Sequence, residues 1–534
     1  MFAHTDGFHA STGSAVSNVQ QGKAPNPPCE SPTEGKAKEQ TPAAPQETSS
    51  AARADKAALK RQVGLGSAVA LIIGSIIGSG IFVTPSSVFR NSGSIGVDLL
   101  VWIVCGILSI TGGLCYAELA TLLPTSGGDY AYLTAATKGL GRFGDVVPFL
   151  QMWCYSLVLD PMSAALQGLT FSSYALSIVY PTCQAPYETT VLVALSFTTL
   201  ATAVNCFSVK TSARVQDIFS SIKCLILISV IITGAVFAFK VTDNHFQDEA
   251  LFRKPESASR LVLAFYGALY SYGGWKQICL IAEEVTEPHK NILRATLIGI
   301  LAVTAIYVLT NVAYFVVLDP NTFATSEAIA VSFTAATWGG NAAGIIPVAV
   351  SISTFGTLCA GFFSSARVIL AASRQGHLAP VFSCITLHTS TPVAAIMLRG
   401  SLALAFTFIG SISYLIEGSV FLENVWEIVV LLCLFGLRHT MKDAHRPYAV
   451  PLPLAVVKFL VSVALVVIPL LRPVDCVQYV VILAMLVAGA VYYTVFVAFS
   501  CSVPGTKPLT RFIQKLLLSV PCTNDLEIML KEKL

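Results

Sequence analysis

The chain has 534 residues, of which 54% are hydrophobic and 12% are charged, roughly half the charge of an ordinary soluble domain. This composition excludes a soluble globular protein, and the net charge of +3 provides no basic field for nucleic acid. The fourteen cysteines are scattered without a CxxC pair, so we interpret most of them as small buried hydrophobes and expect neither a metal site nor a cofactor.

Residues 1–62 differ from the rest, being rich in Pro, Ser, Ala and Gln with almost no large apolar residue after Phe8. A segment of this composition cannot bury a core, so we expect a disordered cytosolic tail. It contains no apolar run suited to a cleavable signal peptide. The first hydrophobic helix is therefore expected to direct membrane insertion.

Apolar runs dominate residues 63–500, and each is at least as long as the roughly 20 residues that one crossing requires. We predict an all-α integral membrane protein with twelve transmembrane helices. Their ranges are 64–89, 96–122, 145–179, 188–208, 213–239, 259–283, 294–318, 342–371, 392–412, 415–437, 452–471 and 475–500. The tail, 501–534, is expected to be cytosolic, with a short amphipathic helix at 509–518 that lies on the membrane surface.

Lys and Arg gather before helix 1 and after helices 2, 4, 6, 8, 10 and 12. With twelve crossings all of these segments fall on one face, which the positive-inside rule identifies as the cytosol. Both termini are then cytosolic. His289 and His377 fall in cytosolic loops, where we expect them to be solvated rather than catalytic.

Two of the predicted helices are interrupted by glycine. Helix 1 has Gly74, Gly78 and Gly80 within seven residues, and helix 6 has Gly273 followed by Gly274. Each glycine costs a helix about 1 kcal/mol, and unwound backbone at membrane depth is tolerated only against protein or a wet cavity. Close packing through small residues is the alternative. Because the interrupted helices are five crossings apart, in corresponding positions of two halves, the pattern favours a transporter's substrate site.

The chemistry of such breaks suits an amino acid. Amides freed at Ser79, Gly80 and Ile81 can bind a carboxylate, and carbonyls freed near Ile76 and Tyr270 can accept from an ammonium group. The predicted substrate-binding residues are Ile76, Ser79, Gly80, Ile81, Tyr270, Gly273, Trp275 and Lys276.

Several further motifs along the chain support the same interpretation. They are GSIIGSGIFVTP at 74–85, CYAEL at 115–119, SGGDY at 126–130, GGW at 273–275 with Glu283 and Glu284, ASRQGH at 372–377, and RPY at 446–448 followed by Val450 and Pro451. Together they resemble the light subunits of heteromeric amino acid transporters, the L-type family within the amino acid–polyamine–organocation superfamily. The resemblance implies a LeuT-like fold of two inverted five-helix repeats plus two helices, with helices 1 and 6 broken. It also implies sodium-independent amino acid exchange by alternating access at the plasma membrane.

Lys223 lies within helix 5, and a lysine inside the membrane is a functional candidate. In sodium-coupled relatives an ion ties helix 1 to helix 8 nearby, and a lysine ammonium can replace its charge. Snorkelling toward the cytosol is the alternative.

Cys183 falls in the outer loop between helices 3 and 4, where family light subunits place the cysteine that binds a single-span glycosylated heavy chain. A disulfide is chemically allowed there. A free thiol or a pair with Cys476 are the alternatives. The chain contains no Asn-x-Ser/Thr sequon, so we expect it to carry no N-glycan.

Some charges depart from the family pattern. Lys276 follows Gly-Gly-Trp where an uncharged residue is usual, Asp160 precedes Pro161, and helix 10 adds Glu423 and Glu427. Lys276 alone favours an anionic substrate side chain, whereas Asp160 alone favours the opposite. We predict that these two pair with each other. In the rival interpretation Lys276 faces the substrate, and Glu427 or solvent balances Asp160.

Asp160 and Glu427 are therefore candidates for selectivity, with neutral or anionic L-amino acids as expected substrates, and the roles of Glu423 and of Arg399 in helix 9 stay open. A channel or receptor with a polytopic core is the second functional class, against which stand the paired breaks. A membrane enzyme is the third, but the chain has no His/Glu metal cluster and no GxSxG motif.

Overall fold

Helices dominate the computed structural model, which describes residues 63–123, 127–138, 140–141, 144–180, 183, 185–207, 210–240, 249–253, 255–326, 328–339, 344–386, 391–471, 476–499 and 506–521. The tail predicted at 1–62 lies outside the described residues. The α-helices are α2 (Leu65–Ile76), α3 (Gly80–Val83), α4 (Pro85–Ser92), α5 (Ile95–Leu122), α6 (Asp129–Thr137), α7 (Val146–Cys154), α8 (Asp160–Val179), α9 (Tyr187–Phe207), α10 (Lys210–Ala238), α11 (Ala258–Ser271), α12 (Gln277–Leu280), α13 (Pro288–Val317), α14 (Pro320–Thr325), α15 (Ile329–Thr337), α16 (Ile345–Arg374), α17 (Val393–Thr407), α18 (Ile412–Thr440), α19 (Leu452–Leu471), α20 (Cys476–Tyr492) and α21 (Thr506–Leu517).

Long apolar helices follow from the sequence because the hydrocarbon core offers no partner for backbone N–H and C=O groups. Within the described ranges, eight helices are long and apolar enough to cross a membrane, and Ile345–Cys359 and Val393–Thr407 are shorter apolar segments. The remaining predicted spans, 145–179 and 259–283, are interrupted helices. The all-α multi-span class is confirmed, whereas the count of twelve crossings and the inverted repeats stay predictions.

Helix 3 departs from regular α geometry at its middle. The π-helical turn η2 (Tyr155–Leu159) separates α7 from α8, and Pro161 stands in the first turn of α8. A proline has no amide hydrogen, and its ring clashes with the carbonyl four residues earlier in an α-helix. The wider turn accommodates it and places Asp160 directly after the irregularity.

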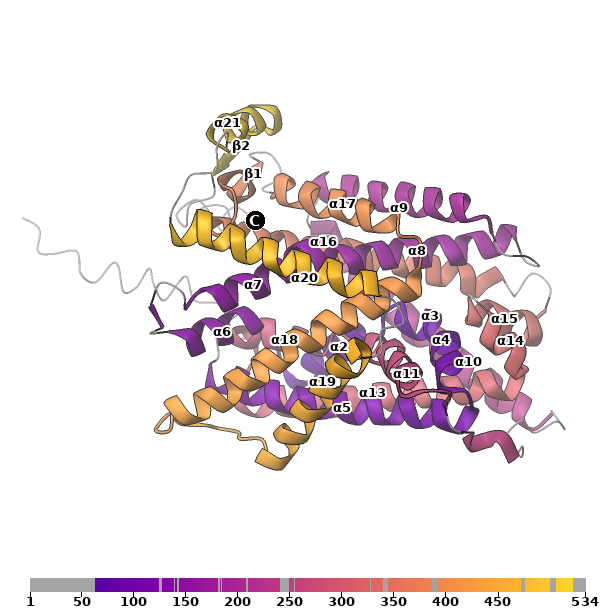
Figure 1. The fold of residues 1–534 in the computed structure, drawn as a ribbon. Coiled ribbons are helices and arrows are strands. Elements are labelled where there is room, and N and C mark those ends of the chain that lie inside the picture. Colours follow the sequence, from indigo (N-terminus) through magenta and orange to yellow (C-terminus); the bar gives the residue numbers. More distant parts are fainter. Residues whose placement is uncertain are drawn as a thin grey trace, which may run out of the picture. The chain divides into compact units, whose positions relative to one another are not determined.

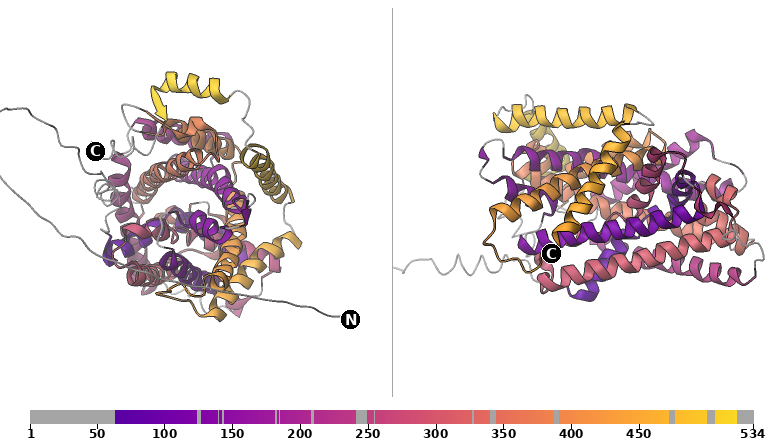
Figure 2. Two further views of the ribbon diagram at one scale, coloured as in Figure 1. Left: turned by 90° about the vertical axis from the view of Figure 1, so that its left-hand side faces the viewer. Right: turned by 60° about the horizontal axis from the view of Figure 1, so that its bottom comes forward.

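The helices pack against partners both near and far in the sequence. The α13 helix runs beside α5 and also contacts α2 and α10, while α8 contacts α9, α16 and α17 (Figures 1 and 2). The α18 helix packs against α11 and α19.

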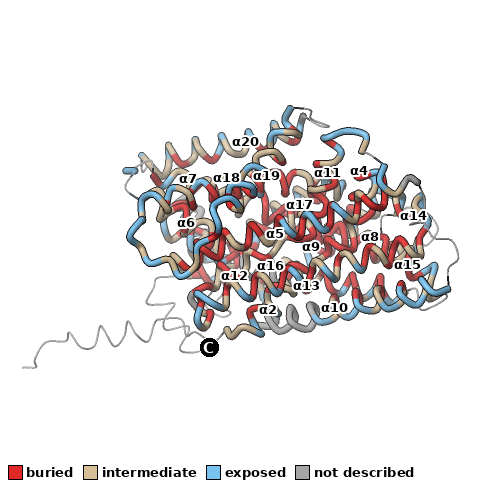
Figure 3. The backbone as a smooth tube through the Cα atoms, turned by 90° about the horizontal axis from the view of Figure 1, so that it is seen from below, coloured by how far each residue is buried: buried red, intermediate tan, exposed pale blue. Residues whose placement is uncertain are grey.

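Burial follows this pairing, as the tube in Figure 3 shows, with buried segments between helices and exposed segments along outer faces such as that of α10. Large apolar side chains remain exposed on these faces, for example Leu192 (63%), Leu225 (65%) and Leu483 (61%). Apolar surface of this extent is unusual in a soluble monomer. It matches the composition and is the surface that lipid would cover.

The described C-terminal segment contacts an earlier loop. The α21 helix is followed by strand β2 (Ser519–Pro521), which pairs antiparallel with β1 (Cys384–Thr386) beside the 3-10 turn η7 (Pro380–Ser383) (Figure 1). The helix expected at 509–518 thus begins at Thr506. Its place on the membrane surface stays a prediction.

Candidate substrate site at two helix breaks

Helix 1 is interrupted where the glycines predicted. The chain bends at residues 77–79, between α2 and α3, and the amide of Phe82 donates to the Ser79 carbonyl at 3.1 Å. Among the described residues no carbonyl accepts from the backbone amides of Ser79, Gly80 or Ile81. These three N–H groups are the ones the sequence assigned to a carboxylate.

Helix 6 breaks between Ser271, the end of α11, and Gln277, the start of α12. Gly274 adopts φ +105°, which an L side chain rarely adopts, and a Cβ there would lie 2.4 Å from the Ser75 carbonyl oxygen. A Cβ on Gly80 would likewise lie 2.7 Å from the Cα of Ser271. The two breaks therefore pack directly against each other, and only glycine permits this approach.

A tyrosine of α13 joins the two breaks. The Tyr307 hydroxyl lies 3.0 Å from the carbonyl oxygens of both Ile76 and Ser271, and Thr84 and Ser271 hydrogen bond through their hydroxyls at 2.7 Å. The Tyr270 carbonyl accepts from the Gly273 amide at 3.1 Å. The carbonyls expected to bind an ammonium group thus already have one partner, and each keeps one further lone pair.

A polar cavity of about 70 Å³ borders the second break. It is lined by Ser109, Leu269, Gly273, Gly274, Trp275, Lys276, Val420, Glu423, Asn424, Glu427 and Lys458. The Lys276 ammonium lies over the rings of Tyr116, at 5.1 Å, and Trp275, at 5.5 Å. The Glu427 carboxylate forms an ion pair with Lys458 at 3.0 Å, and both side chains are buried.

The predicted pair between Lys276 and Asp160 is wrong. The Arg399 Nη2 donates to Asp160 Oδ1 at 3.0 Å, and its Nε lies 2.5 Å from Oδ2. The guanidinium also stacks over Phe362 at 4.2 Å. In the rival interpretation, the part that gives Glu427 to Asp160 is wrong as well, since Glu427 pairs with Lys458, whereas the part that turns Lys276 toward the substrate stays a prediction.

Lys223 is buried, with 4% of the residue exposed, and its ammonium donates to the Thr357 hydroxyl of α16 at 2.6 Å. The α16 helix is the predicted helix 8, so the expected contact between Lys223 and helix 8 is present. The side chain does not snorkel toward solvent. Within the described part of the chain this is its one hydrogen bond, so no hydrogen bond from Lys223 to helix 1 is seen, although α10 packs against α2.

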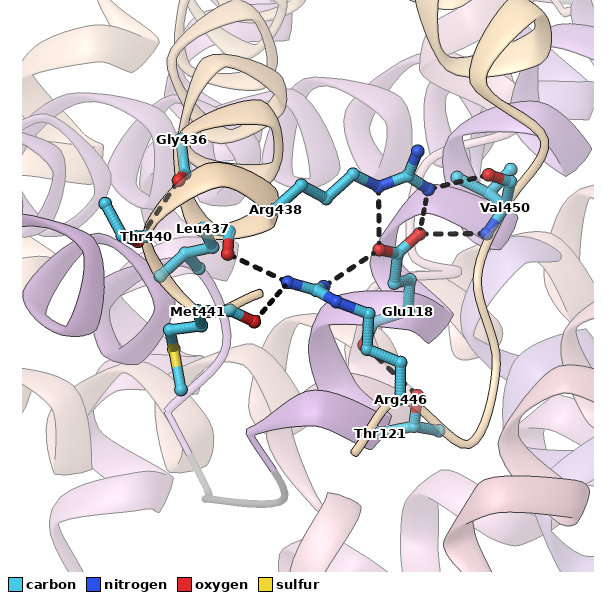
Figure 4. Close-up of polar contacts among 9 residues, drawn as sticks. All are labelled: Glu118, Thr121, Gly436, Leu437, Arg438, Thr440, Met441, Arg446 and Val450. Atoms are coloured by element: carbon cyan, nitrogen blue, oxygen red, sulfur yellow. Dashed lines mark hydrogen bonds and ion pairs between the residues drawn. The ribbon is translucent and has the colours of Figure 1, made fainter. Parts of the chain in front are cut away.

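A buried carboxylate near the end of α5 accepts hydrogen bonds from two arginines and one backbone amide (Figure 4). Glu118, with 0% exposure, accepts from Arg438 Nε at 2.9 Å, from Arg438 Nη2, from Arg446 Nη1 at 3.1 Å and from the Val450 amide at 2.8 Å. The network joins α5 to α18 and to the segment before α19.

Known proteins are similar to this chain over most of its length. A family profile described as amino acid permease matches residues 63–496. The chain belongs to the amino acid permease family. This permease is 34% identical over 476 residues to the b(0,+)-type amino acid transporter 1 of Mus musculus, covering 88% of the chain and 95% of that protein. It is 38% identical over 401 residues to the Large neutral amino acids transporter small subunit 2 of Mus musculus, covering 74% and 73%.

The resemblance to light subunits of heteromeric amino acid transporters is thereby confirmed. The permease is a multi-pass membrane protein, and its family consists of transporters rather than enzymes. Cys183, the candidate for the intersubunit disulfide, is exposed. The described ranges contain no group of three His, Cys, Asp or Glu residues that could hold a metal ion.

One histidine of the permease differs from its prediction. His377 is 9% exposed, its ring packs edge-on against Phe149, and its Nδ1 lies 3.5 Å from the Tyr130 hydroxyl. Burial lowers the pKa of His377 below its ordinary value. It is therefore a packed loop residue rather than a solvated one.

Proposed function

We propose that this permease carries amino acids across the membrane by alternating access, with the substrate's head group bound between the two helix breaks. The observation that carries the proposal is the direct packing of the breaks, fixed by Gly80, Gly274 and Tyr307. The names of the similar proteins, an amino acid transporter and a transporter subunit, support it.

The proposed recognition follows from the free backbone groups. The substrate carboxylate accepts from the amides of Ser79, Gly80 and Ile81, which have no acceptor in the described ranges. The substrate ammonium donates to the remaining lone pairs of the Ile76 and Tyr270 carbonyls. Backbone groups recognise the part that all amino acids share, which leaves side-chain selection to other residues.

Helix pairing supports the LeuT-like architecture. Helices 1 and 6 meet at their breaks. Three further pairs of helices are in contact: α5 with α13, α8 with α16, and α9 with α17. In the predicted order of crossings these are helix 2 with helix 7, helix 3 with helix 8, and helix 4 with helix 9. Each pair is five crossings apart, as two inverted repeats around a shared axis require.

Three finer features belong to the same proposal. Lys223, bonded to α16 through Thr357, supplies the charge that an ion supplies elsewhere, so transport is independent of sodium. Cys183 links the permease to a single-span glycosylated heavy chain. The complex resides in the plasma membrane with both termini cytosolic, and residues 63–500 form the twelve-helix transporter domain.

Substitution of one glycine tests the site. Gly80→Ala places a methyl group 2.7 Å from the Ser271 backbone, which forces the breaks apart, so uptake of labelled neutral amino acids into vesicles is expected to be lost. Gly66→Ala is the matched control, because a Cβ on Gly66 meets no atom within 4 Å. Equal uptake by the two variants, at equal amounts in the membrane, would contradict the proposed site.

A further inference from the structure

The cavity beside the second break is too polar to serve only as packing space. Of its lining side chains, Lys276, Glu423, Glu427 and Lys458 are ionisable, and Asn424 and Ser109 are polar. Its volume of about 70 Å³ corresponds to roughly five water-sized spheres. That is enough for the end of one polar side chain and a few waters. Gly273 and Gly274 border both this cavity and the predicted head-group site.

Two buried acceptors in the cavity wall lack a donor. Glu427 is 7% exposed and Asn424 is 4% exposed. Glu427 uses Oε2 for Lys458, at 3.0 Å, and for the Ser462 hydroxyl, at 3.5 Å. Glu427 Oε1 and Asn424 Oδ1 accept no hydrogen bond from the described residues. Buried acceptors in native proteins are almost always paired, so these two atoms are available to accept from a ligand or water with N–H or O–H groups.

A donor faces the same space without a partner of its own. Lys276 forms neither a hydrogen bond nor an ion pair within the described ranges, and it is held over the faces of Tyr116 and Trp275. Its charge is opposed at longer range by Asp129, Glu427 and Glu423. The ammonium therefore has donors available for a carbonyl or carboxylate oxygen.

The charges around the cavity indicate whether this oxygen belongs to a carbonyl or to a carboxylate. The cavity lining carries two lysines and two glutamates, and Asp129 adds a third carboxylate whose charge acts on Lys276 at longer range. An anionic side chain that accepted from Lys276 would lie beside Glu423 and Glu427, and a cationic one that donated to Glu427 would lie beside Lys276 and Lys458. A neutral group with an acceptor at one end and donors at the other satisfies Lys276, Glu427 Oε1 and Asn424 Oδ1 without adding charge.

We propose that this cavity selects the side chain of the substrate, and that the preferred substrates are neutral amino acids with a carboxamide, such as glutamine and asparagine. The side-chain carbonyl accepts from Lys276, and the NH₂ group donates to Glu427 Oε1 and Asn424 Oδ1. This inference rests on the proposed amino acid transport and names its substrate class.

A substrate panel on the full-length protein, reconstituted with whatever subunit co-purifies, tests the proposal. Glutamine, glutamate, leucine and alanine are compared by kcat/KM for uptake. We expect glutamine to exceed both glutamate and leucine by at least about tenfold, because a site built for hydrogen bonds strongly rejects analogues that leave its polar groups unpaired.

Lys276→Met keeps the length of the side chain and removes the donor. We expect the ratio of glutamine to alanine kcat/KM to fall by at least about tenfold, since alanine has no polar side chain to lose a contact. Lys290→Met, which changes an exposed lysine paired with Glu287, is the control and leaves the ratio unchanged.

The outcomes separate the inference from the function beneath it. Wild-type protein that transports alanine but prefers leucine or glutamate to glutamine overturns the inference alone. An unchanged ratio in Lys276→Met also overturns it, because the cavity then holds only water. Folded wild-type protein that takes up none of the four amino acids overturns the proposed function itself.

Discussion

Replacing Glu118 by Gln should destabilise the folded permease more than any comparable change on its surface. The carboxylate is fully buried and accepts from Arg438, Arg446 and the Val450 amide (Figure 4). Glutamine keeps one acceptor oxygen and turns an NH₂ group toward these donors. The two guanidinium groups then lose their counter-ion inside the protein.

The magnitude follows from the burial of each partner. A hydrogen bond to a charged group contributes about 1.5–3 kcal/mol, and removing one member of a buried ion pair costs about 3–5 kcal/mol. The side chains of Arg438 and Arg446 are 22% and 15% exposed, so water compensates part of the loss. We expect a loss of about 3 kcal/mol, near the lower end of that range.

Thermal unfolding of purified protein in one detergent measures this loss against a matched control. Glu256→Gln makes the same chemical change in the ion pair with Arg260, whose side chains are 77% and 49% exposed. Exposed pairs of this kind contribute about 0–1 kcal/mol. The melting temperature of Glu118→Gln should therefore lie clearly below that of Glu256→Gln. Equal melting temperatures would refute the role assigned to the network.

Three further predictions concern pairs and charges elsewhere in the permease. Asp160→Asn and Arg399→Gln should each cost about 3–5 kcal/mol, because each strands a buried partner, and the double variant should recover part of the loss in thermal unfolding; additive losses would count against the pair. Cys183→Ser should remove a higher band from non-reducing gels of native membranes while sparing much of the transport, and an apparent mass that reductant does not change would dismiss the disulfide. Replacing sodium by choline should leave uptake nearly unchanged, whereas Lys223→Ala, which removes the bond to Thr357, should cripple it; a large loss in choline would contradict the sodium-replacing role.

Features set by local sequence were predictable. The apolar runs gave the helices within a few residues, because the hydrocarbon core requires backbone hydrogen bonds to close within each segment. The helix breaks were predictable because Gly80 and Gly274 occupy positions where a Cβ would meet backbone atoms of the opposite helix. A cluster of glycines therefore indicates, from one sequence alone, a place where the backbone must approach another segment closely.

Pairing across the sequence was not predictable in the same way. Hydropathy gives the depth of a charge in the membrane but not the side of the helix on which it lies. Asp160 finds Arg399, 239 residues away, rather than Lys276, because the side of helix 3 that carries its carboxylate faces helix 9. Lys458 was missed although it meets the criterion that singled out Lys223, a lysine inside an apolar span. Glu118 stood in a recognised motif, but its arginine partners are more than 300 residues distant.

Counterflow in proteoliposomes tests the central claim, amino acid exchange by alternating access, most directly. Vesicles containing the purified permease are loaded with a labelled neutral amino acid, and efflux is followed before and after unlabelled substrate is added outside. In an exchanger the binding site reorients across the membrane faster when it is loaded with substrate than when it is empty. Efflux should therefore accelerate severalfold, and Gly80→Ala should abolish the acceleration. Efflux that proceeds at the same rate with and without external substrate would contradict exchange and indicate a channel.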